Sequence, residues 1–206
     1  MPRLLLASAS PRRRELLALL GVRYTVAVSR FAEETLAHLT DPIEYVSRAA
    51  ESKAAEVARR RPTCLVLGVD TDVVAPDGTI LGKPGDTADA HRLLRSLSGR
   101  THSVYSGVAL LQSDVAGEII RQAVRVEETR VTFGDLSDAA IAAYVATGEP
   151  MDKAGGYGIQ GGAMAFVTRV EGDLSNVIGL PLWTVGEMLT SFDVPLWRPQ
   201  EPAADV

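Results

Sequence analysis

Residues 63–70 read Thr63-Cys64-Leu65-Val66-Leu67-Gly68-Val69-Asp70, an apolar run that follows Pro62 and ends on a carboxylate. An apolar run of this length without polar alternation predicts a strand that is buried on both faces, as in sheets covered by helices. Open α/β folds usually place their ligand sites at the carboxyl ends of such strands. The run therefore predicts an α/β protein in which Asp70 lies at the edge of a site.

Helical and strand patterns alternate on both sides of this run. We expect further strands at residues 3–7, 24–28, 101–112, 118–133 and 163–170. We expect helices at residues 11–20, 42–60, 86–97, 137–146 and 181–192. The alternation predicts a mixed twisted sheet with flanking helices, shaped as two lobes around a central cleft. Residues 1–192 form a single domain in this interpretation, and residues 193–206 form a loose C-terminal tail.

The composition is that of a globular protein, with 206 residues, 46% of them hydrophobic, and a formal net charge of −5. The negative charge argues against a nucleic-acid partner, which needs a basic face. No apolar run approaches the roughly 20 residues that span a bilayer, and residues 4–7 are too few for a signal-peptide core of about 7–15 residues. We therefore expect no membrane association. The single cysteine, Cys64, cannot form an internal disulfide, which favours a cytoplasmic location.

A basic turn joins the first strand to the first helix, with the sequence Ser8-Ala9-Ser10-Pro11-Arg12-Arg13-Arg14. Arginines are unexpected in a first helical turn, because the helix dipole favours acids there. The free N–H groups of such a turn bind anions, so a bound phosphate would offset the conflict. Arg13 also begins an apolar stripe at helical spacing, which should turn it toward the protein. The alternative is an exposed basic turn that makes surface ion pairs.

Lys53 interrupts the apolar face of the second helix, which is otherwise formed by Ile43, Val46, Ala50 and Val57. A lysine in this position either extends along its stem to solvent or meets a buried anion.

Two further positions could carry chemistry near the end of the buried run. Asp70 could hold a divalent metal, act as a general base on water, or only cap a turn. Lys83 lies on a tight loop ahead of a helix, where it could reach a phosphate. Because Pro84 follows it in place of the required Ser or Thr, a P-loop is excluded.

A glycine-dense loop spans residues 155–162 and contains five glycines. Such a loop either lets the backbone approach a ligand closely or only turns sharply. Asp152 and Lys153, just before it, could pair with each other or contribute to a site.

Several motifs, taken in chain order, resemble those of the Maf-like nucleoside-triphosphate pyrophosphatases. They are Leu6-Ala7-Ser8-Ala9-Ser10-Pro11-Arg12-Arg13, Gly68-Val69-Asp70-Thr71, Leu81-Gly82-Lys83-Pro84, Gly99-Arg100-Thr101-His102-Ser103-Val104, Asp152-Lys153-Ala154-Gly155 and Ser175-Asn176-Val177-Ile178-Gly179-Leu180-Pro181. The resemblance covers residues 3–190. It implies a fold similar to that of the inosine-triphosphate pyrophosphatases and a homodimer. It also implies hydrolysis of a nucleotide between its α- and β-phosphates with a divalent metal, Mg²⁺ or Mn²⁺.

The resemblance also implies roles for individual residues. Asp70 would be the proton acceptor that activates the attacking water, and Glu33 would assist it at the metal. The triphosphate would be held by Ser8, Arg13, Lys53 and Lys83. The four cations Arg12, Arg13, Lys53 and Lys83, set against the two carboxylates, predict a locally basic site in an acidic chain. The chain departs from the family pattern at Asp72, where family members usually continue into apolar residues.

Base specificity is implied by three positions, because Arg12, Thr71 and Gln160 mark the branch similar to UTP/dTTP pyrophosphatases. A related branch that acts on 7-methyl-GTP has Glu in place of Gln160. A Gln amide can pair with both the N3–H and the carbonyl of uracil or thymine, whereas a carboxylate has no donor for the carbonyl.

The sequence thus predicts a hydrolase that converts dTTP and UTP, and modified pyrimidine nucleotides, to the monophosphate plus pyrophosphate. Two alternatives stay open. One is a nucleotide-binding regulator of cell division that acts through a protein partner, in keeping with the family's link to bacterial septum formation. The other is a pyrophosphatase for other modified nucleotides.

Overall fold

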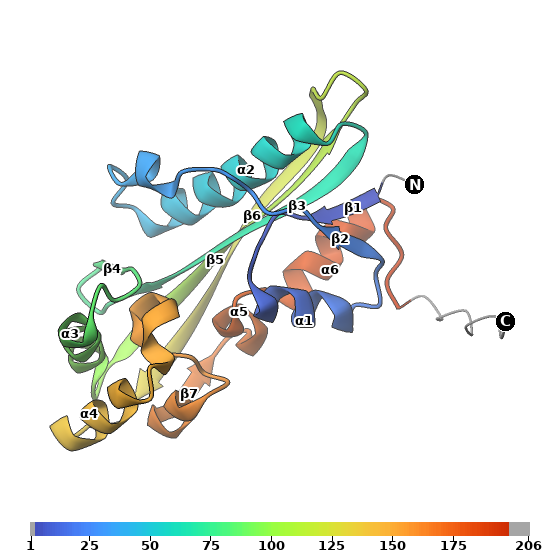
Figure 1. Cartoon of the computed structure of the whole chain (residues 1–206). Helices are drawn as coiled ribbons and strands as arrows, with labels where there is room; N and C mark the ends of the chain where they lie inside the picture. The colour runs from blue at the N-terminus through green and yellow to red at the C-terminus, as the bar shows by residue number, and fades with distance from the viewer. Residues whose placement is uncertain (1–2, 198–206) are drawn as a thin grey trace, which may run out of the picture.

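A computed structural model describes residues 3–197, which contain a seven-stranded sheet in the order β2-β1-β3-β5-β6-β7, with β4 paired to β3 (Figure 1). The strands are β1 (Arg3–Leu6), β2 (Tyr24–Val26), β3 (Cys64–Val74), β4 (Ile80–Leu81), β5 (Thr101–Ser113), β6 (Ile119–Phe133) and β7 (Val167–Glu171). β1 lies parallel to β2 and β3, and the other pairs are antiparallel. The predicted mixed sheet is confirmed.

Helices flank this sheet, which confirms the predicted α/β class. The α-helices are α1 (Pro11–Leu19), α2 (Pro42–Arg60), α3 (Thr87–Leu97), α4 (Asp138–Ala146), α5 (Leu174–Ile178) and α6 (Leu182–Ser191). Short 3-10 helices are η1 (Glu33–Leu36), η2 (Glu149–Asp152), η3 (Ala154–Gly156) and η4 (Gly162–Phe166). Ser10 caps α1 by accepting a hydrogen bond from the Arg13 N–H, and Pro11 occupies its first turn, as expected.

The long strands β3, β5 and β6 run through two differently packed ends of the molecule (Figure 1). At one end, α1 and α6 cover one face of the sheet over one apolar core, and α2 covers the other face over a second apolar core. At the other end, α3, α4 and the segment before β7 enclose a third core. Val69 belongs to the first end and Val73 to the second, so the residues between them lie at the junction.

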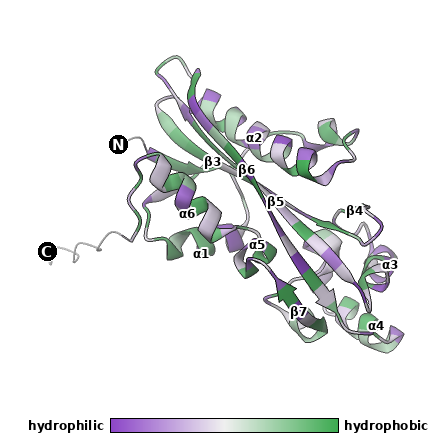
Figure 2. Cartoon of the chain, turned by 180° about the vertical axis from the view of Figure 1, so that it is seen from behind, coloured by the Kyte–Doolittle hydropathy of each residue, from purple (hydrophilic) through white to green (hydrophobic). Residues whose placement is uncertain are grey.

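Helix α2 packs unusually close to the sheet, because glycines lie beneath it. A Cβ on Gly68 would lie 2.2 Å from the Ala50 carbonyl oxygen, and one on Gly107 would lie 2.0 Å from that of Val46. Any larger residue would push the helix away. Polar and apolar residues alternate along α2 in Figure 2, as expected of a helix with one face on the sheet.

Some element boundaries differ from the sequence-based expectation. β3 continues beyond the apolar run to Val74, since residues 70–74 still pair with β5. The strand expected at 163–170 begins only at Val167, because residues 162–166 form η4. Helix α5 was not expected at all.

The C-terminal segment is described as far as Trp197. Val194 and Leu196 pack against the core beneath α1 and α6, and the Trp197 N–H donates to the Leu20 carbonyl oxygen at 2.8 Å. Residues 198–206 of the predicted tail lie outside the described residues.

Between residues 3 and 197, no helix combines the length and apolar character that crossing a membrane requires.

Candidate active site

A cavity of about 840 Å³ opens at the junction of the two ends of the sheet. All nine site residues predicted from the sequence line this cavity. They are Ser8, Arg12, Arg13, Glu33, Lys53, Asp70, Thr71, Lys83 and Gln160. Residues separated by up to 152 positions along the chain therefore share one space.

Lys53 meets two carboxylates inside this cavity. Its Nζ lies 2.5 Å from Oδ1 of Asp70 and 2.7 Å from Oε1 of Glu33. The lysine side chain is 12% exposed and that of Asp70 is 9% exposed, whereas Glu33 is half exposed. Of the two interpretations of Lys53, contact with a buried anion is therefore the correct one, and the anion belongs to the protein. Because α2 packs closely over Gly68, the Lys53 ammonium lies next to Asp70 at the end of the apolar run.

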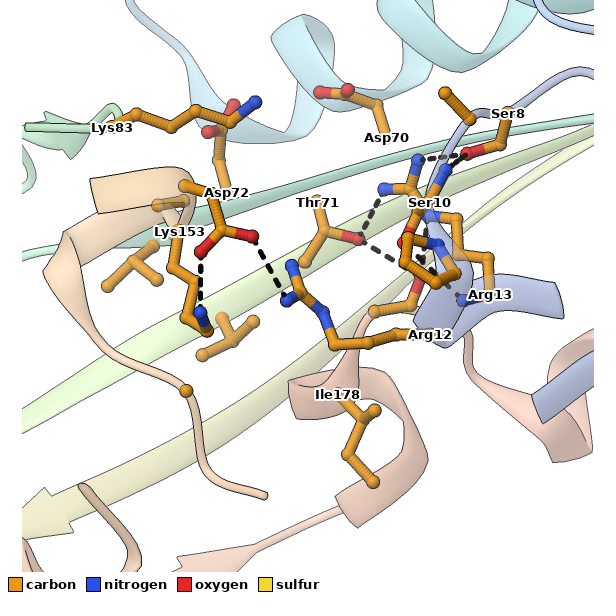
Figure 3. A pocket seen from close by; sticks show the side chains of 18 of the residues that line it. Ser8, Ser10, Arg12, Arg13, Asp70, Thr71, Asp72, Lys83, Lys153 and Ile178 are labelled. Carbon is orange, nitrogen blue, oxygen red and sulfur yellow. Dashed lines mark hydrogen bonds and ion pairs between the residues drawn. The ribbon is translucent and has the colours of Figure 1, made fainter. Parts of the chain in front are cut away.

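Arg13 ties the N-terminal turn to the sheet. Its Nε donates to the Gly179 carbonyl oxygen at 2.9 Å, Nη1 to Ser8 Oγ at 3.2 Å, and Nη2 to Thr71 Oγ1 at 3.1 Å. Thr71 Oγ1 also shares a 2.8 Å hydrogen bond with Ser106 Oγ. Figure 3 shows the hydrogen bonds of the Arg13 guanidinium to Ser8 and Thr71, with the guanidinium pointing toward the cavity. Burial lowers the pKa of Arg13, and the nearby carboxylates of Asp70 and Glu33 oppose that effect.

Arg12 faces another segment of the cavity. Its Nη1 lies 3.5 Å from Oδ2 of Asp152, whose Oδ1 accepts a hydrogen bond from Lys153 Nζ at 2.5 Å. Arg12 and Lys153 thus each contact one of the two oxygens of the same carboxylate (Figure 3). The sequence left open whether Asp152 and Lys153 pair with each other or contribute to a site; they pair, and both line the cavity.

Comparison with known proteins identifies the family that the sequence motifs resemble, and the match covers nearly the whole chain. The model of the family described as "Maf-like protein" matches residues 3–192. The chain belongs to the Maf-like family.

Curated relatives of this Maf-like chain cover nearly its whole length. A protein of Moorella thermoacetica is 51% identical over 96% of this chain and 98% of its own length, and one of Symbiobacterium thermophilum is 49% identical over 96% and 97%. A protein of Salinibacter ruber is 54% identical over 87% of this chain and 85% of its own length. Each of the three is named "dTTP/UTP pyrophosphatase".

The expectation of a locally basic site is wrong for this Maf-like cavity. Besides the six charged residues predicted, it is lined by Asp72, Glu149, Asp152 and Lys153. Five cationic side chains therefore face five acidic ones, and the formal charges balance. The sequence did not predict this balance, because three of the acids come from other segments: Asp72 from the end of β3, and Glu149 and Asp152 from η2.

Asp72 is the most perturbed of these carboxylates. Burial, together with the charges of Asp70 and Glu33, raises its pKa to about 7. Tyr45 of α2 also lines the cavity, and burial and the same group of acids raise the pKa of its phenol to about 12. The period-2 alternation that put Asp70 and Asp72 on one face of the strand was the available signal for Asp72; nothing marked Tyr45.

Lys83 and Gln160 are both exposed at the edge of the Maf-like cavity. Their loops are joined by a backbone hydrogen bond from the Gly155 N–H to the Gly82 carbonyl oxygen at 3.1 Å. The two side chains therefore lie on segments that are fixed to each other but leave the side chains free to meet a ligand.

Within residues 3–197, no group of three or more His, Cys, Asp or Glu side chains has an arrangement that could hold a metal ion. The carboxylates that come together are Glu33 and Asp70, which share the ammonium of Lys53.

Proposed function

We propose that this chain hydrolyses dTTP and UTP to the nucleoside monophosphate and pyrophosphate. The observation that carries the proposal is that the nine residues assigned to this reaction by motif line one cavity. Support comes from the relatives that are 49–54% identical and are named "dTTP/UTP pyrophosphatase".

Asp70 is the proton acceptor in this proposal. Its carboxylate is largely buried at the end of the apolar run, and Lys53 donates to Oδ1. Among the described residues none donates to Oδ2, so this oxygen can accept a proton from water. The water oxygen attacks the α-phosphorus, the bond from that phosphorus to the α–β bridging oxygen breaks, and pyrophosphate leaves.

The cationic side chains stabilise the charge that builds up on the phosphate oxygens. Arg13 is held in place by three acceptors, so its guanidinium needs little rearrangement when the substrate binds. Lys53 and Ser8 also line the cavity, and exposed Lys83 enters it from the loop between β4 and α3. We assign these four residues to the triphosphate.

Base recognition is assigned to Arg12, Thr71 and Gln160. Gln160 offers one donor and one acceptor, which matches the N3–H and the adjacent carbonyl of uracil and thymine. The Thr71 hydroxyl accepts a hydrogen bond from Arg13, which connects these three residues to the group assigned to the triphosphate.

A divalent metal, Mg²⁺ or Mn²⁺, fits the residues present. Glu33 and Asp70 supply hard carboxylate oxygens that already converge on one cation, the Lys53 ammonium. Mg²⁺ is ordinarily held by one or two carboxylates together with substrate phosphates, so a larger protein ligand set is not required. Because the charges lining the cavity balance, such an ion would supply the positive charge that a triphosphate needs.

We also propose that the enzyme is located in the cytoplasm and forms a homodimer. The single cysteine suits a reducing compartment. Light scattering of the purified protein would measure the oligomeric state.

The reaction is tested by pyrophosphate release from dTTP, UTP, CTP, ATP and GTP with Mg²⁺ or Mn²⁺, and with EDTA as the metal-free control. We expect pyrophosphate and the monophosphate from dTTP and UTP, and loss of turnover in EDTA. Orthophosphate and the diphosphate as products would overturn the proposal, since they require attack at the γ-phosphorus.

A further inference from the structure

The loop that carries Gln160 has few hydrogen bonds of its own. Within residues 155–162, the Gly156 N–H donates to Lys153 and the Gly161 N–H donates to Gly158, each at 3.0 Å. Gln160 itself is exposed, so its side chain is not held by packing. The direction in which the amide points therefore depends on what fixes the backbone on either side of it.

Glu149 fixes the backbone on both sides. Its Oε2 accepts from the Gly162 N–H at 3.0 Å, and its Oε1 accepts from the Tyr144 hydroxyl at 2.9 Å. That hydroxyl in turn accepts from the Gly158 N–H at 3.2 Å. One carboxylate is thus connected to residues 158 and 162, which flank Gln160 at two positions on each side.

The loop closes tightly around this carboxylate. A Cβ on Gly161 would lie 2.0 Å from Glu149 Oε1, and one on Gly158 would lie 2.6 Å from the Lys153 side chain. A larger residue at position 161 would displace the Glu149 carboxylate, which gives a physical reason for glycine at that position.

Tyr144 is itself well anchored. It is buried, and its ring packs edge-on against Phe166 with centroids 5.2 Å apart. Its hydroxyl, on helix α4, therefore gives the Glu149 carboxylate a fixed partner. The same carboxylate holds the loop through the Gly162 N–H.

We propose that Glu149 is a positioning residue for nucleobase recognition: it holds residues 158–162 so that the Gln160 amide faces the base, and it thereby sets the preference for uracil and thymine. This inference rests on the proposed function, because it concerns the same site. Glu149 acts through the loop and is not assigned to the reacting phosphates.

The experiment compares the full-length Glu149→Ala, Glu149→Gln and Tyr144→Phe variants with the parent and with Glu187→Ala. Glu187 is half exposed and pairs with Arg125 at 2.8 Å, so it controls for the loss of a glutamate elsewhere. kcat and KM are measured with UTP, dTTP, ATP and GTP. Amide hydrogen exchange reports the order of residues 156–162 independently of activity.

The expected result for Glu149→Ala is a fall of about tenfold in the kcat/KM for UTP, with a much smaller change for ATP, so the UTP-to-ATP ratio falls. Faster exchange of the loop amides should accompany it. Glu149→Gln should restore most of the ratio, because an amide can accept from Gly162 and donate to Tyr144. Tyr144→Phe should lower the ratio by a smaller factor, since the Gly162 contact remains.

An unchanged UTP-to-ATP ratio in Glu149→Ala, or an equal loss for every nucleotide, would overturn the inference. If Glu149→Ala does not fold, the Tyr144→Phe variant decides, and an unchanged ratio there overturns it equally. A parent protein that releases no pyrophosphate from any nucleotide would instead overturn the proposed function.

Discussion

Two walls of the cavity are stabilised in different ways. The charged wall, formed by Ser8, Arg13, Lys53 and Asp70, consists of side chains that bind one another directly. The loop wall, formed by residues 149–162, consists of backbone N–H groups held by one carboxylate and by aromatic residues behind it. Substitutions in the charged wall should therefore change the charge beside the reacting atoms, whereas substitutions behind the loop wall should change geometry or stability.

The largest effect is expected from Asp70→Asn in the charged wall. The amide has the same shape but cannot accept a proton from water, so turnover should fall by at least about 100-fold, the typical contribution of a general base. Single-turnover pyrophosphate release measures the loss, and thermal unfolding verifies the fold. Asp193→Asn, at an exposed carboxylate that pairs with Arg121, is the matched control and should keep the parent rate. A fully active Asp70→Asn variant would remove Asp70 from the proposed reaction.

Lys53→Met should destabilise the charged wall. It removes the cation that Asp70 and Glu33 share and leaves the buried Asp70 carboxylate without its partner. Breaking a buried pair from one side costs about 3–5 kcal/mol in the free energy of unfolding, to be measured by urea titration. The double variant Lys53→Met with Asp70→Asn should recover part of that loss, because the second change removes the unpaired charge. Equal stability of the single and double variants would contradict the pairing.

The charged wall was predictable from the sequence to a large extent. Asp70 follows an apolar run, Lys53 breaks an apolar helix face, and Arg13 conflicts with a helix dipole. Each is a charged residue in a locally unfavourable position, which predicts a partner of opposite charge. Their mutual contacts were not predictable, since the 2.5 Å Lys53–Asp70 pair depends on how closely α2 approaches Gly68.

The loop wall was much less predictable. Glu149 looks like any surface glutamate in the sequence, and its function depends on a tyrosine and two glycine N–H groups that only the fold brings together. The strand expected at 163–170 was wrong at its start for a related reason. A short apolar run such as Ala163–Phe166 does not distinguish a strand from a tight helix, and here Phe166 turns into the aromatic core.

The buried contact between His102 and Tyr157 lies behind the loop wall, and its contribution to stability can be tested through pH. His102 is 2% exposed, its Nε2 lies 2.8 Å from the hydroxyl of Tyr157 in the loop, and burial lowers its pKa to about 4. The unfolded chain, with an ordinary histidine pKa near 6.5, takes up the proton first as the pH falls. The stabilising effect of neutral His102 is therefore complete above about pH 6.5 and is lost between about pH 6.5 and 4.

The measurement compares urea unfolding of the parent and of His102→Gln from pH 7 to pH 4. The difference in free energy of unfolding should shrink by about 2–3 kcal/mol over that range. Taking the difference cancels other groups, including Asp72, whose raised pKa has the opposite effect on stability. A difference that does not vary with pH would show that His102 does not titrate between the folded and unfolded states.

The smallest effect is expected outside both walls, at the ion pair between Arg125 and Glu187. Its charged atoms lie 2.8 Å apart, nearly as close as those of the Lys53 pairs inside the cavity, but both side chains are about half exposed. Water screens such a pair, so Glu187→Ala should change the free energy of unfolding by less than about 1 kcal/mol and leave turnover unchanged. Urea unfolding at low and high salt measures the effect, which should shrink further in high salt. A loss as large as that of Lys53→Met would show that burial is not what separates the charged wall from the surface.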